Sequence, residues 1–452
     1  CGGRPGLAGL AGLIVRVPCA QAQRRDIPWR MPPPLRPADP AASGSAHCLD
    51  DALRQRAARV VPGGMTGHLS AARLPAGYPQ FFERGRGCRL WDVDGREFID
   101  FMCSCGPNLL GHHHPEVEAA AARQAALGDC LNGPTARFVE LAERLVARIA
   151  HADWVMFQKN GTDATTVCAT IARAATGRRK ILVAQGAYHG SAPWCTPAPA
   201  GITPEDRVHF ATYRYNDIAS LDAAAAAAGN DLAGIFASAF KHDLGIDQEL
   251  PTPAFARRAR ELCDAAGAAL ILDEVRAGYR LHPAGSWEPL GIRPDLSAWS
   301  KAIANGYALA AVAGVDALRD AASRIFTTGS FWAGGVAMAA ALATSEVAER
   351  EDLVGHLERV GRRFREGIDA QAASHGLAVR QSGPVQLPLI LFEGDPAFEK
   401  GSLFAAEALA RGVYLHPKHN MFLSLAHTEA DIDQALAATD EAFAVVAARH
   451  GR

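Results

Sequence analysis

Long apolar runs, basic stretches and closely paired cysteines are missing from this 452-residue sequence, and each absence excludes a class of protein. No apolar run reaches the roughly 18 to 20 residues that a helix needs to cross a bilayer, so we expect a soluble protein that acts without a membrane. Lysines and arginines form only short pairs and the formal net charge is -2, which argues against binding to nucleic acid.

The spacing of the cysteines gives no sign of a metal site. None of the ten forms the C-x-x-C pair of a zinc site, and the closest two, Cys103 and Cys105, are separated by a single residue. Disulfides rarely persist in the cytosol. We therefore expect reduced cysteines, no bound metal and a cytoplasmic location.

The first 45 residues differ in composition from the rest. They are rich in Pro, Gly, Ala and Arg and have no periodic apolar pattern, so we expect residues 1–45 to be a disordered or non-native N-terminal extension. The stretch 7–22 partly resembles the apolar segment of an export signal, but Arg16 interrupts it. An extension upstream of a start at Met31 is the simpler account.

Apolar runs of strand length alternate with alanine-rich amphipathic stretches from residue 50 onward, a pattern typical of α/β proteins. Several runs are continuously apolar, as expected for strands that helices cover on both faces. We expect helices at 163–176 and 253–266. The sequence predicts a mainly parallel sheet with seven strands: 154–158, 180–184, 208–213, 232–240, 268–275, 296–299 and 310–315.

After Gly329 the pattern changes to long helices and short strands, which predicts a smaller α+β domain. We expect residues 50–105 to return to this domain, so that the large domain covers 106–340 and the small domain combines 50–105 with 341–452. The elements expected in its C-terminal part are helices at 337–349 and 352–373, short strands near 387–392 and 422–425, and a last helix from residue 428.

Two loops follow the first strands of the expected sheet, at the edge where open α/β sheets bind ligands. The run NGTD at 160–163 opens a helix, so its backbone N–H groups and the Thr162 hydroxyl can hold a phosphate. An ordinary helix cap has the same residues. The run AYHG at 187–190 offers an aromatic face to a bound ring, although a surface aromatic also fits.

Two later strands end in ionisable residues. Alternation along the strand at 268–275 puts Asp273 and Val275 on one face and Glu274 on the other. A carboxylate there can pair with a protonated pyridine nitrogen, or simply form an ionic contact. Lys301 follows the next strand; an amine held among apolar neighbours has a lowered pKa, as a Schiff-base lysine needs, whereas most lysines are solvated. The ordered set of phosphate loop, aromatic, aspartate and lysine favours a site for pyridoxal 5'-phosphate (PLP).

Five blocks of the sequence resemble class III aminotransferases, which are PLP enzymes of fold type I: NGTDATTVCATIARAATGRRKI, AYHG, ALILDEVRAGYR, DLSAWSKAIANGYALAAVAG and GSFWAGGVAMAAALAT. The subgroup that it resembles most is glutamate-1-semialdehyde 2,1-aminomutase, through PGG, LWDVDGREFIDF, GPNLLGHHHPEV and FLSLAHTEADID. The resemblance covers about residues 55–445.

This resemblance implies a role for each matching residue. Lys301 forms the Schiff base with PLP and moves the proton, and Asp273 pairs with the pyridine nitrogen. Val275 and Tyr188 enclose the ring, while Gly161 and Thr162 hold the phosphate. Ser330 stands in place of a threonine that reaches the phosphate from the neighbouring subunit, which implies a homodimer with shared active sites. The full cofactor-binding set is Gly161, Thr162, Tyr188, His189, Asp273, Val275, Lys301 and Ser330.

The sequence departs from the aminomutase pattern in three places. Ser70 stands where that pattern has an arginine for the substrate carboxylate, and Arg73 is three residues away. The usual Glu-Pro before the aspartate strand is Phe240-Lys241 here, and the loop at 416–421 is shorter and reads HPKHNM. We therefore predict a substrate other than glutamate 1-semialdehyde.

Four residues are candidate substrate contacts, three of them at these departures. They are Ser70, Ser104, His416 and Lys418. The basic and imidazole groups near both altered loops either recognise an anionic or polyhydroxylated substrate or are solvated loop residues. They are Lys241, His242, Lys418 and His419.

Transamination is the predicted reaction, in which an amino donor passes its amino group through the Lys301 aldimine to an aldehyde or keto acceptor. Intramolecular amine transfer of the aminomutase type and racemisation begin with the same proton loss and remain alternatives. A catalytically silent scaffold with the PLP fold is a third, disfavoured because both Lys301 and Asp273 are present.

Overall fold

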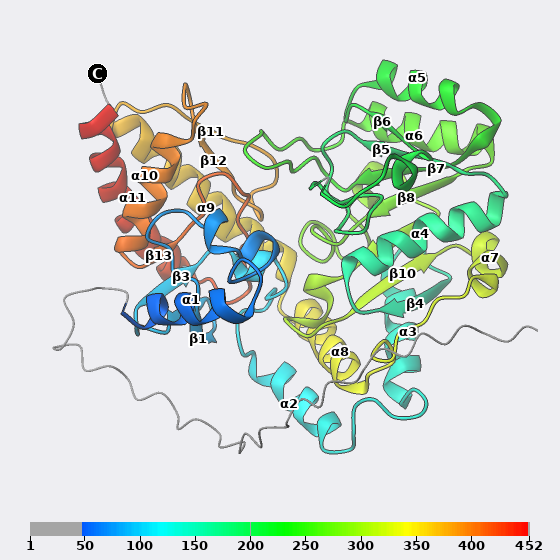
Figure 1. Cartoon of the computed structure of the whole chain (residues 1–452), viewed down its shortest axis with the longest axis horizontal. Helices are drawn as coiled ribbons and strands as arrows, with labels where there is room; N and C mark the ends of the chain where they lie inside the picture. Colours follow the sequence, from blue (N-terminus) through cyan, green and yellow to red (C-terminus); the bar gives the residue numbers. More distant parts are fainter. Residues whose placement is uncertain (1–47, 199, 451–452) are drawn as a thin grey trace, which may run out of the picture. The chain divides into compact units, whose positions relative to one another are not determined.

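A seven-stranded sheet runs through the chain in the order β4-β10-β9-β8-β7-β5-β6 (Figure 1). The computed structural model describes residues 48–198 and 200–450, so the expected extension at 1–45 lies outside the described residues. Neighbouring strands from β5 to β9 pair in parallel, and β10 is antiparallel to both β9 and β4. The predicted α/β architecture is confirmed. The strands are β4 (Trp154–Gln158), β5 (Lys180–Ala184), β6 (Phe210–Tyr213), β7 (Leu232–Ser238), β8 (Ala269–Asp273), β9 (Leu296–Trp299) and β10 (Ala310–Gly314).

Helices cover both faces of this sheet because its strands are apolar on both faces. In β8, Leu270 and Leu272 pack in a cluster with two helices, and Ile271 packs in a second cluster on the opposite face. The helices of the first cluster are α5 (Ile218–Ala228) and α6 (Pro253–Ala266), and those of the second are α4 (Gly161–Thr176) and α7 (Arg319–Arg324). The helices predicted at 163–176 and 253–266 are thereby confirmed as α4 and α6.

Helix α8 (Gly335–Arg350) packs against α2 (Pro115–Ala125) and α3 (Ala136–Arg148). Its alanines, among them Ala337 and Ala340, are buried at these contacts, and their small side chains allow the helices to approach closely. The helix predicted at 337–349 therefore exists and extends slightly at both ends.

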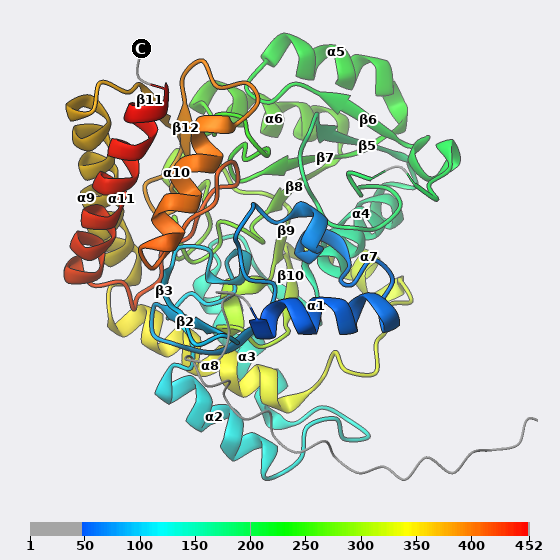
Figure 2. The same ribbon diagram turned by 60° about the vertical axis from the view of Figure 1, so that its left-hand side comes forward.

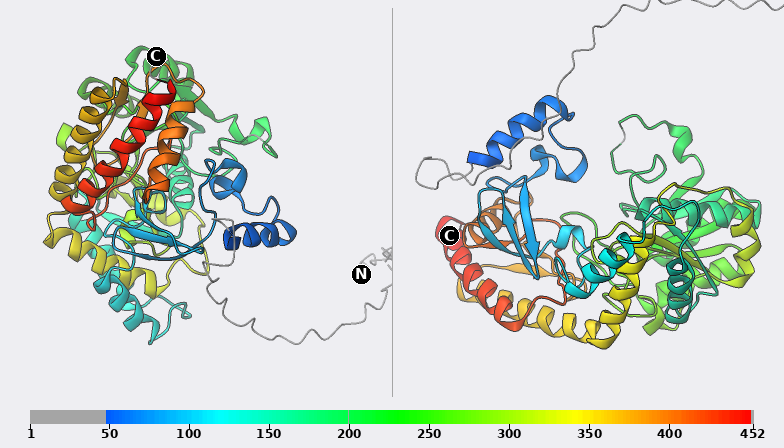
Figure 3. Two further views of the ribbon diagram at one scale, coloured as in Figure 1. Left: turned by 90° about the vertical axis from the view of Figure 1, so that its left-hand side faces the viewer. Right: turned by 90° about the horizontal axis from the view of Figure 1, so that it is seen from below.

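A second, four-stranded sheet combines three strands between residues 82 and 100 with one strand at residues 413–414. Its order is β1-β2-β3-β13, and β13 pairs in parallel with β3, with Val413 opposite Ile99. Three long helices pack together beside it (Figure 2; Figure 3). The strands of this sheet are β1 (Phe82–Arg86), β2 (Arg89–Asp92), β3 (Glu97–Asp100) and β13 (Val413–Tyr414), and the helices are α9 (Leu353–Ser374), α10 (Glu399–Ala410) and α11 (Glu429–His450). A separate antiparallel pair consists of β11 (Val379–Gln381) and β12 (Ile390–Phe392).

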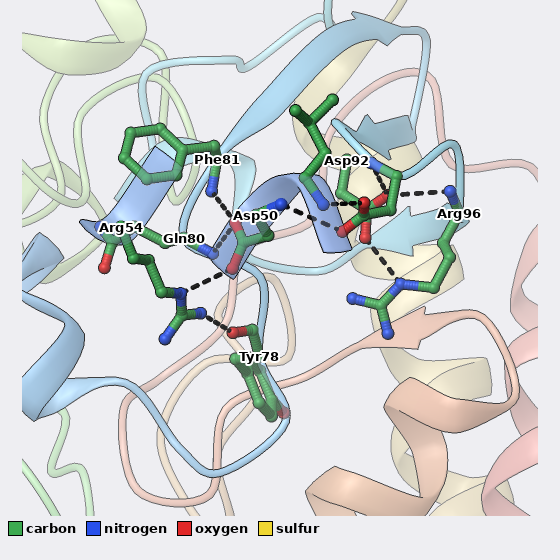
Figure 4. A network of polar contacts seen from close by, with 9 residues as sticks. Asp50, Arg54, Tyr78, Gln80, Phe81, Asp92 and Arg96 are labelled. Carbon is green, nitrogen blue, oxygen red and sulfur yellow. Dashed lines mark hydrogen bonds and ion pairs between the residues drawn. The ribbon is translucent and has the colours of Figure 1, made fainter. Parts of the chain in front are cut away.

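One buried carboxylate fixes helix α1 (Cys48–Val60) to the segment that leads into β1 (Figure 4). Asp50 Oδ1 accepts the N–H groups of Gln80 (2.9 Å) and Phe81 (2.8 Å), and its Oδ2 accepts from Arg54 Nε (2.6 Å). Arg54 lies on α1 itself, so the two backbone donors, Gln80 and Phe81, make the position of the helix specific, and all three donors satisfy the buried charge.

Residues 422–425 do not form the short strand predicted there. The N–H of Phe422 donates to Phe101 O (2.7 Å), whereas the N–H of Leu423 donates to Gln386 O (3.2 Å). These acceptors belong to separate segments, so no single neighbouring strand is available for a β-ladder.

Across residues 48–198 and 200–450, the helices are too short or too polar to span a bilayer. In the same ranges, no three His, Cys, Asp or Glu side chains are grouped so that they could hold a metal ion. Seven cysteines there are free thiols.

Candidate active site

A cavity of about 330 Å³ lies beside the loops that follow β4, β5, β8 and β9. These strands run in the same direction, so their carboxyl ends meet at one edge of the sheet. The cavity brings together seven of the residues that the sequence analysis assigned to the cofactor: Gly161, Thr162, Tyr188, His189, Asp273, Val275 and Lys301.

The loop after β4 forms the start of helix α4. Asn160 and Asp163 form a capping box, in which the Asn160 N–H donates to Asp163 Oδ2 (2.9 Å). Thr162 Oγ1 accepts the N–H of Ser191 (3.1 Å), which ties the loop after β5 to this helix start. The positive end of α4 and the Thr162 hydroxyl thus lie together at the cavity, an arrangement that suits a phosphate.

Two glycines keep this part of the cavity narrow. A Cβ at Gly161 would lie 2.8 Å from Val275 Cγ1, and a Cβ at Gly190 would lie 2.3 Å from Thr162 Oγ1. Gly190 also has φ +129°, which side-chain-bearing residues rarely adopt. The backbone at each glycine can lie this close to the neighbouring side chain only because neither position has a side chain of its own.

Asp273, the last residue of β8, is held by two donors. Its Oδ2 lies 2.7 Å from His189 Nδ1, and its Oδ1 accepts the N–H of Val275 (3.0 Å). A carboxylate only accepts, so the imidazole donates. Both side chains are buried, and His189 Nε2 has no partner among the described residues. The aspartate therefore has a single orientation at the cavity wall.

Lys301 follows β9 and begins the short 3₁₀-helix Lys301–Ala304 with a left-handed φ of 50°. The turn after it is fixed by Asn305, which accepts the N–H of Leu110 (2.7 Å) and donates to Gly111 O (3.0 Å). Burial, and then the charge of Arg276, lower the pKa of Lys301 to about 7. A substantial fraction of this amine is thus neutral near pH 7 and able to attack a carbonyl carbon.

Glu274 does not line the cavity, in agreement with the alternation expected over residues 268–275, although β8 itself ends at Asp273. It is fully buried and accepts bonds from Ser286 N (2.6 Å) and Ser286 Oγ (2.5 Å). Burial raises the pKa of Glu274 to about 7. The two neighbouring carboxylates thus have different surroundings.

The other predicted site residues lie outside the cavity. Ser330 is exposed on the connection between α7 and α8. The four candidate substrate contacts, Ser70, Ser104, His416 and Lys418, do not line it either. His416 Nδ1 accepts the N–H groups of Lys418 (3.2 Å) and His419 (2.8 Å), so this imidazole shapes its own loop.

Several polar side chains that line the cavity were not assigned from the sequence. They are Lys159, Arg276, Ser300 and Tyr307, and His242, which the sequence left open, joins them. Alternation could not have found Arg276, because β8 ends at Asp273 and the chain then turns. The available signal was its position directly after the DEV run.

The residues present fit PLP. The start of α4 suits the phosphate, the oriented Asp273 suits a protonated pyridine nitrogen, and the Lys301 amine suits the carbonyl carbon. Val275 and Tyr188 also line the cavity and can contact a ring.

The chain belongs to the class-III aminotransferases, since the model of that family matches residues 74–443. Aminopentol aminotransferase of Sphingopyxis macrogoltabida is 51% identical over 394 residues, covering 87% of this chain and 93% of that relative. Glutamate-1-semialdehyde 2,1-aminomutase of Bordetella avium is 33% identical over 426 residues, covering 88% and 99%. The similarity to the aminotransferase is therefore higher than that to the aminomutase.

The solved structure of the FumI protein of Sphingopyxis sp. MTA144, in its PLP internal aldimine form, has a TM-score of 0.87 with this chain. It is 51% identical and covers 88% of this chain and 96% of its own. The predicted family, fold type and cofactor are confirmed: this chain is a PLP-dependent aminotransferase of fold type I.

Proposed function

We propose that this aminotransferase takes its amino group from an amine that carries several hydroxyl groups and no carboxylate, as the word aminopentol describes, and passes it to a carbonyl acceptor. The 51% identity to the aminopentol aminotransferase of Sphingopyxis macrogoltabida over 87% of this chain supports this donor class. Ser70 supports it too, because a serine cannot hold a substrate carboxylate as the arginine of the aminomutase pattern does.

The proposal of PLP-dependent amino transfer rests on one observation: Lys301 and Asp273 line the same cavity. PLP, when bound, withdraws electrons from the carbon that carries the amine, so that this carbon can lose a proton. Lys301 Nζ binds the cofactor and then moves that proton. Asp273 keeps the pyridine nitrogen protonated, and His189 orients Asp273.

The remaining roles follow the cavity lining. Gly161 and Thr162 bind the phosphate at the start of α4. Tyr188 and Val275 line the same cavity, where they would enclose the cofactor ring and limit the access of water to it.

We also propose a homodimer in which Ser330 of one subunit reaches the phosphate bound by the other. Ser330 is exposed, and its neighbours Phe326 and Phe331 are 95% and 65% exposed, which is unusual for large apolar side chains without a partner. The seven free thiols support a reducing, cytoplasmic location.

Intramolecular amine transfer is the second candidate, favoured by the 33% identity to the Bordetella avium aminomutase. The two functions differ in whether a separate acceptor is needed. Conversion of glutamate 1-semialdehyde to 5-aminolevulinate without an acceptor would support the second candidate and contradict the first.

The test is an absorption spectrum of the PLP-loaded protein, with Lys301→Ala in parallel, followed by addition of aminopentol. We expect a visible band from the lysine-bound cofactor, its absence in the variant, and its loss from the wild type when the amine is added. A wild-type band that aminopentol leaves unchanged, while glutamate 1-semialdehyde removes it, would overturn the proposed donor class.

A further inference from the structure

Arg276 is a charged residue of the cavity to which the roles above give no task. The residue is only 9% exposed, and it lines the same cavity as Lys301. Burial of a guanidinium is unfavourable unless an anion compensates for its charge. Asp273, the carboxylate of this cavity, is paired with His189 instead, and Glu274 accepts its bonds from Ser286. Among the described residues, no carboxylate forms an ion pair with Arg276.

Neutral groups hold Arg276 in place. Its Nη1 donates to Asn420 Oδ1 and, at 3.4 Å, to His419 Nε2. Burial, and then the charge of Arg276 itself, hold the pKa of His419 well below its usual range, so the ring accepts as a neutral imidazole. The Phe422 ring centroid lies 5.8 Å from Arg276 Cζ. The loop at 419–422 therefore fixes the guanidinium without neutralising it.

The other edge of the guanidinium has no hydrogen-bond partner among the residues that the structure describes. Arg276 Nε is buried and has no hydrogen-bond partner in the part of the chain that the structure describes, and no acceptor there contacts Nη2. Nε–H and Nη2–H point the same way along one edge of the planar group. Their spacing matches the two oxygens of a carboxylate.

We propose that Arg276 binds the carboxylate of a 2-oxo acid acceptor, and of the α-amino acid that it becomes, through its Nε and Nη2 edge. The inference rests on the proposed function, because it names the acceptor of the same reaction. Arg276 and Lys301 line one cavity of about 330 Å³ that also has to hold the cofactor. The carboxylate must therefore lie close to the reacting carbonyl, as it does in a 2-oxo acid.

This role makes Arg276 a specificity residue for one of the two substrates. The hydroxylated amine has no carboxylate to form the paired, charge-assisted contact, so its binding should depend much less on the guanidinium. Removal of Arg276 should therefore impair the half-reaction with the 2-oxo acid acceptor much more than the half-reaction with the amine donor. A purely structural role would impair both.

The test compares Arg276→Met with wild-type holoenzyme, using pyruvate and propanal as acceptors. The two probes differ in the carboxylate. We expect the KM for pyruvate to rise by about 100-fold and that for propanal to change by less than about 3-fold. Arg276→Lys keeps the charge but not the paired N–H groups, so we expect a rise of about 10-fold for pyruvate. If Arg276→Met does not fold, the comparison of pyruvate with propanal is made with Arg276→Lys.

Arg365→Met is the matched control. Arg365 is a partly buried arginine of α9 that donates only to the carbonyls of Ser382 and Gly383, and its Nε also lacks a partner in the described part of the chain. It does not line the cavity, so its loss should leave the ratio of the two KM values unchanged. Equal losses with pyruvate and propanal in Arg276→Met would overturn the inference.

Propionate gives a readout that needs no turnover. We expect calorimetry to detect its binding to PLP-loaded wild type and Arg365→Met, and binding at least about 10-fold weaker to Arg276→Met. Equal propionate affinity in all three proteins, or none in the wild type, would overturn the inference. If propionate binds through Arg276 but aminopentol leaves the cofactor band unchanged, the proposed function fails and the carboxylate site stands.

Discussion

His189 donates from Nδ1 to Asp273 Oδ2 across 2.7 Å, at a buried wall of the cavity. The backbone N–H of Val275 occupies the other carboxylate oxygen at 3.0 Å. Two donors on two different segments thus fix the plane of one carboxylate. The far nitrogen of His189 is buried without a described partner, so the imidazole has no competing bond that would turn it away.

Asp273→Asn is expected to lower kcat/KM for transamination by roughly 10²- to 10³-fold, because an amide cannot balance the charge of a protonated pyridine nitrogen. The side chain keeps its shape, so the protein should still fold and still bind PLP. The measurement is steady-state kinetics together with the PLP content of the purified variant.

Asp243→Asn is the control for that substitution. Asp243 is a partly buried carboxylate in the segment after β7, and it does not line the cavity. We expect its activity to stay within about 3-fold of the wild type. Similar activities for Asp273→Asn and Asp243→Asn would show that Asp273 has no special task.

Gly190→Ala should weaken PLP binding by about 10-fold or more, since the new Cβ would lie 2.3 Å from Thr162 Oγ1 and would displace the phosphate loop. Equilibrium dialysis of PLP against the apo protein measures this. Gly133→Ala, where a Cβ meets no atom within 4 Å, should bind PLP as the wild type does. An unchanged affinity in Gly190→Ala would contradict the assignment of the loop.

Much of the sheet could be predicted because its strands are short, apolar and separated by amphipathic helices. The strands β4, β5 and β9 have the predicted bounds, and the site loops were found because each follows a strand whose carboxyl end lies at one edge. Residues 422–425 are equally apolar, but their N–H groups bond to separate segments, and composition carries no information about that.

The position of Arg276 at the cavity could not be predicted from the sequence. Alternation assigns faces only while a strand lasts, and β8 ends three residues before Arg276. Its partners, His419 and Asn420, lie more than 140 residues away along the chain. Only the folded chain brings the three together.

Phe326→Glu should convert the proposed homodimer to monomers and reduce retention of PLP. Phe326 is 95% exposed near Ser330, and a buried charge at a subunit contact is strongly unfavourable. Sedimentation velocity measures the mass of each species. Phe326→Leu keeps an apolar side chain and should remain dimeric. A wild type that sediments as a monomer while it retains PLP and activity would contradict the shared site.

Glu274 should make stability depend on pH in a predictable direction. Burial raises its pKa to about 7 in the folded chain, against an ordinary value of 4.5. Between these values the folded state holds a proton that the unfolded state has released. The contribution of Glu274 is thus favourable at the acidic end of this range and is lost as pH rises to about 7.

Glu274→Gln removes this dependence, because the amide does not titrate. As pH rises from about 4.5 to about 7, we expect the Tm of the wild type to fall relative to that of Glu274→Gln, by roughly 2–4 °C or more. Above pH 7.5 the difference between the two should become constant. Differential scanning fluorimetry of both holoenzymes at half-unit pH steps measures the difference. A difference that stays constant across this window, or that changes in the opposite direction, would contradict the raised pKa of Glu274.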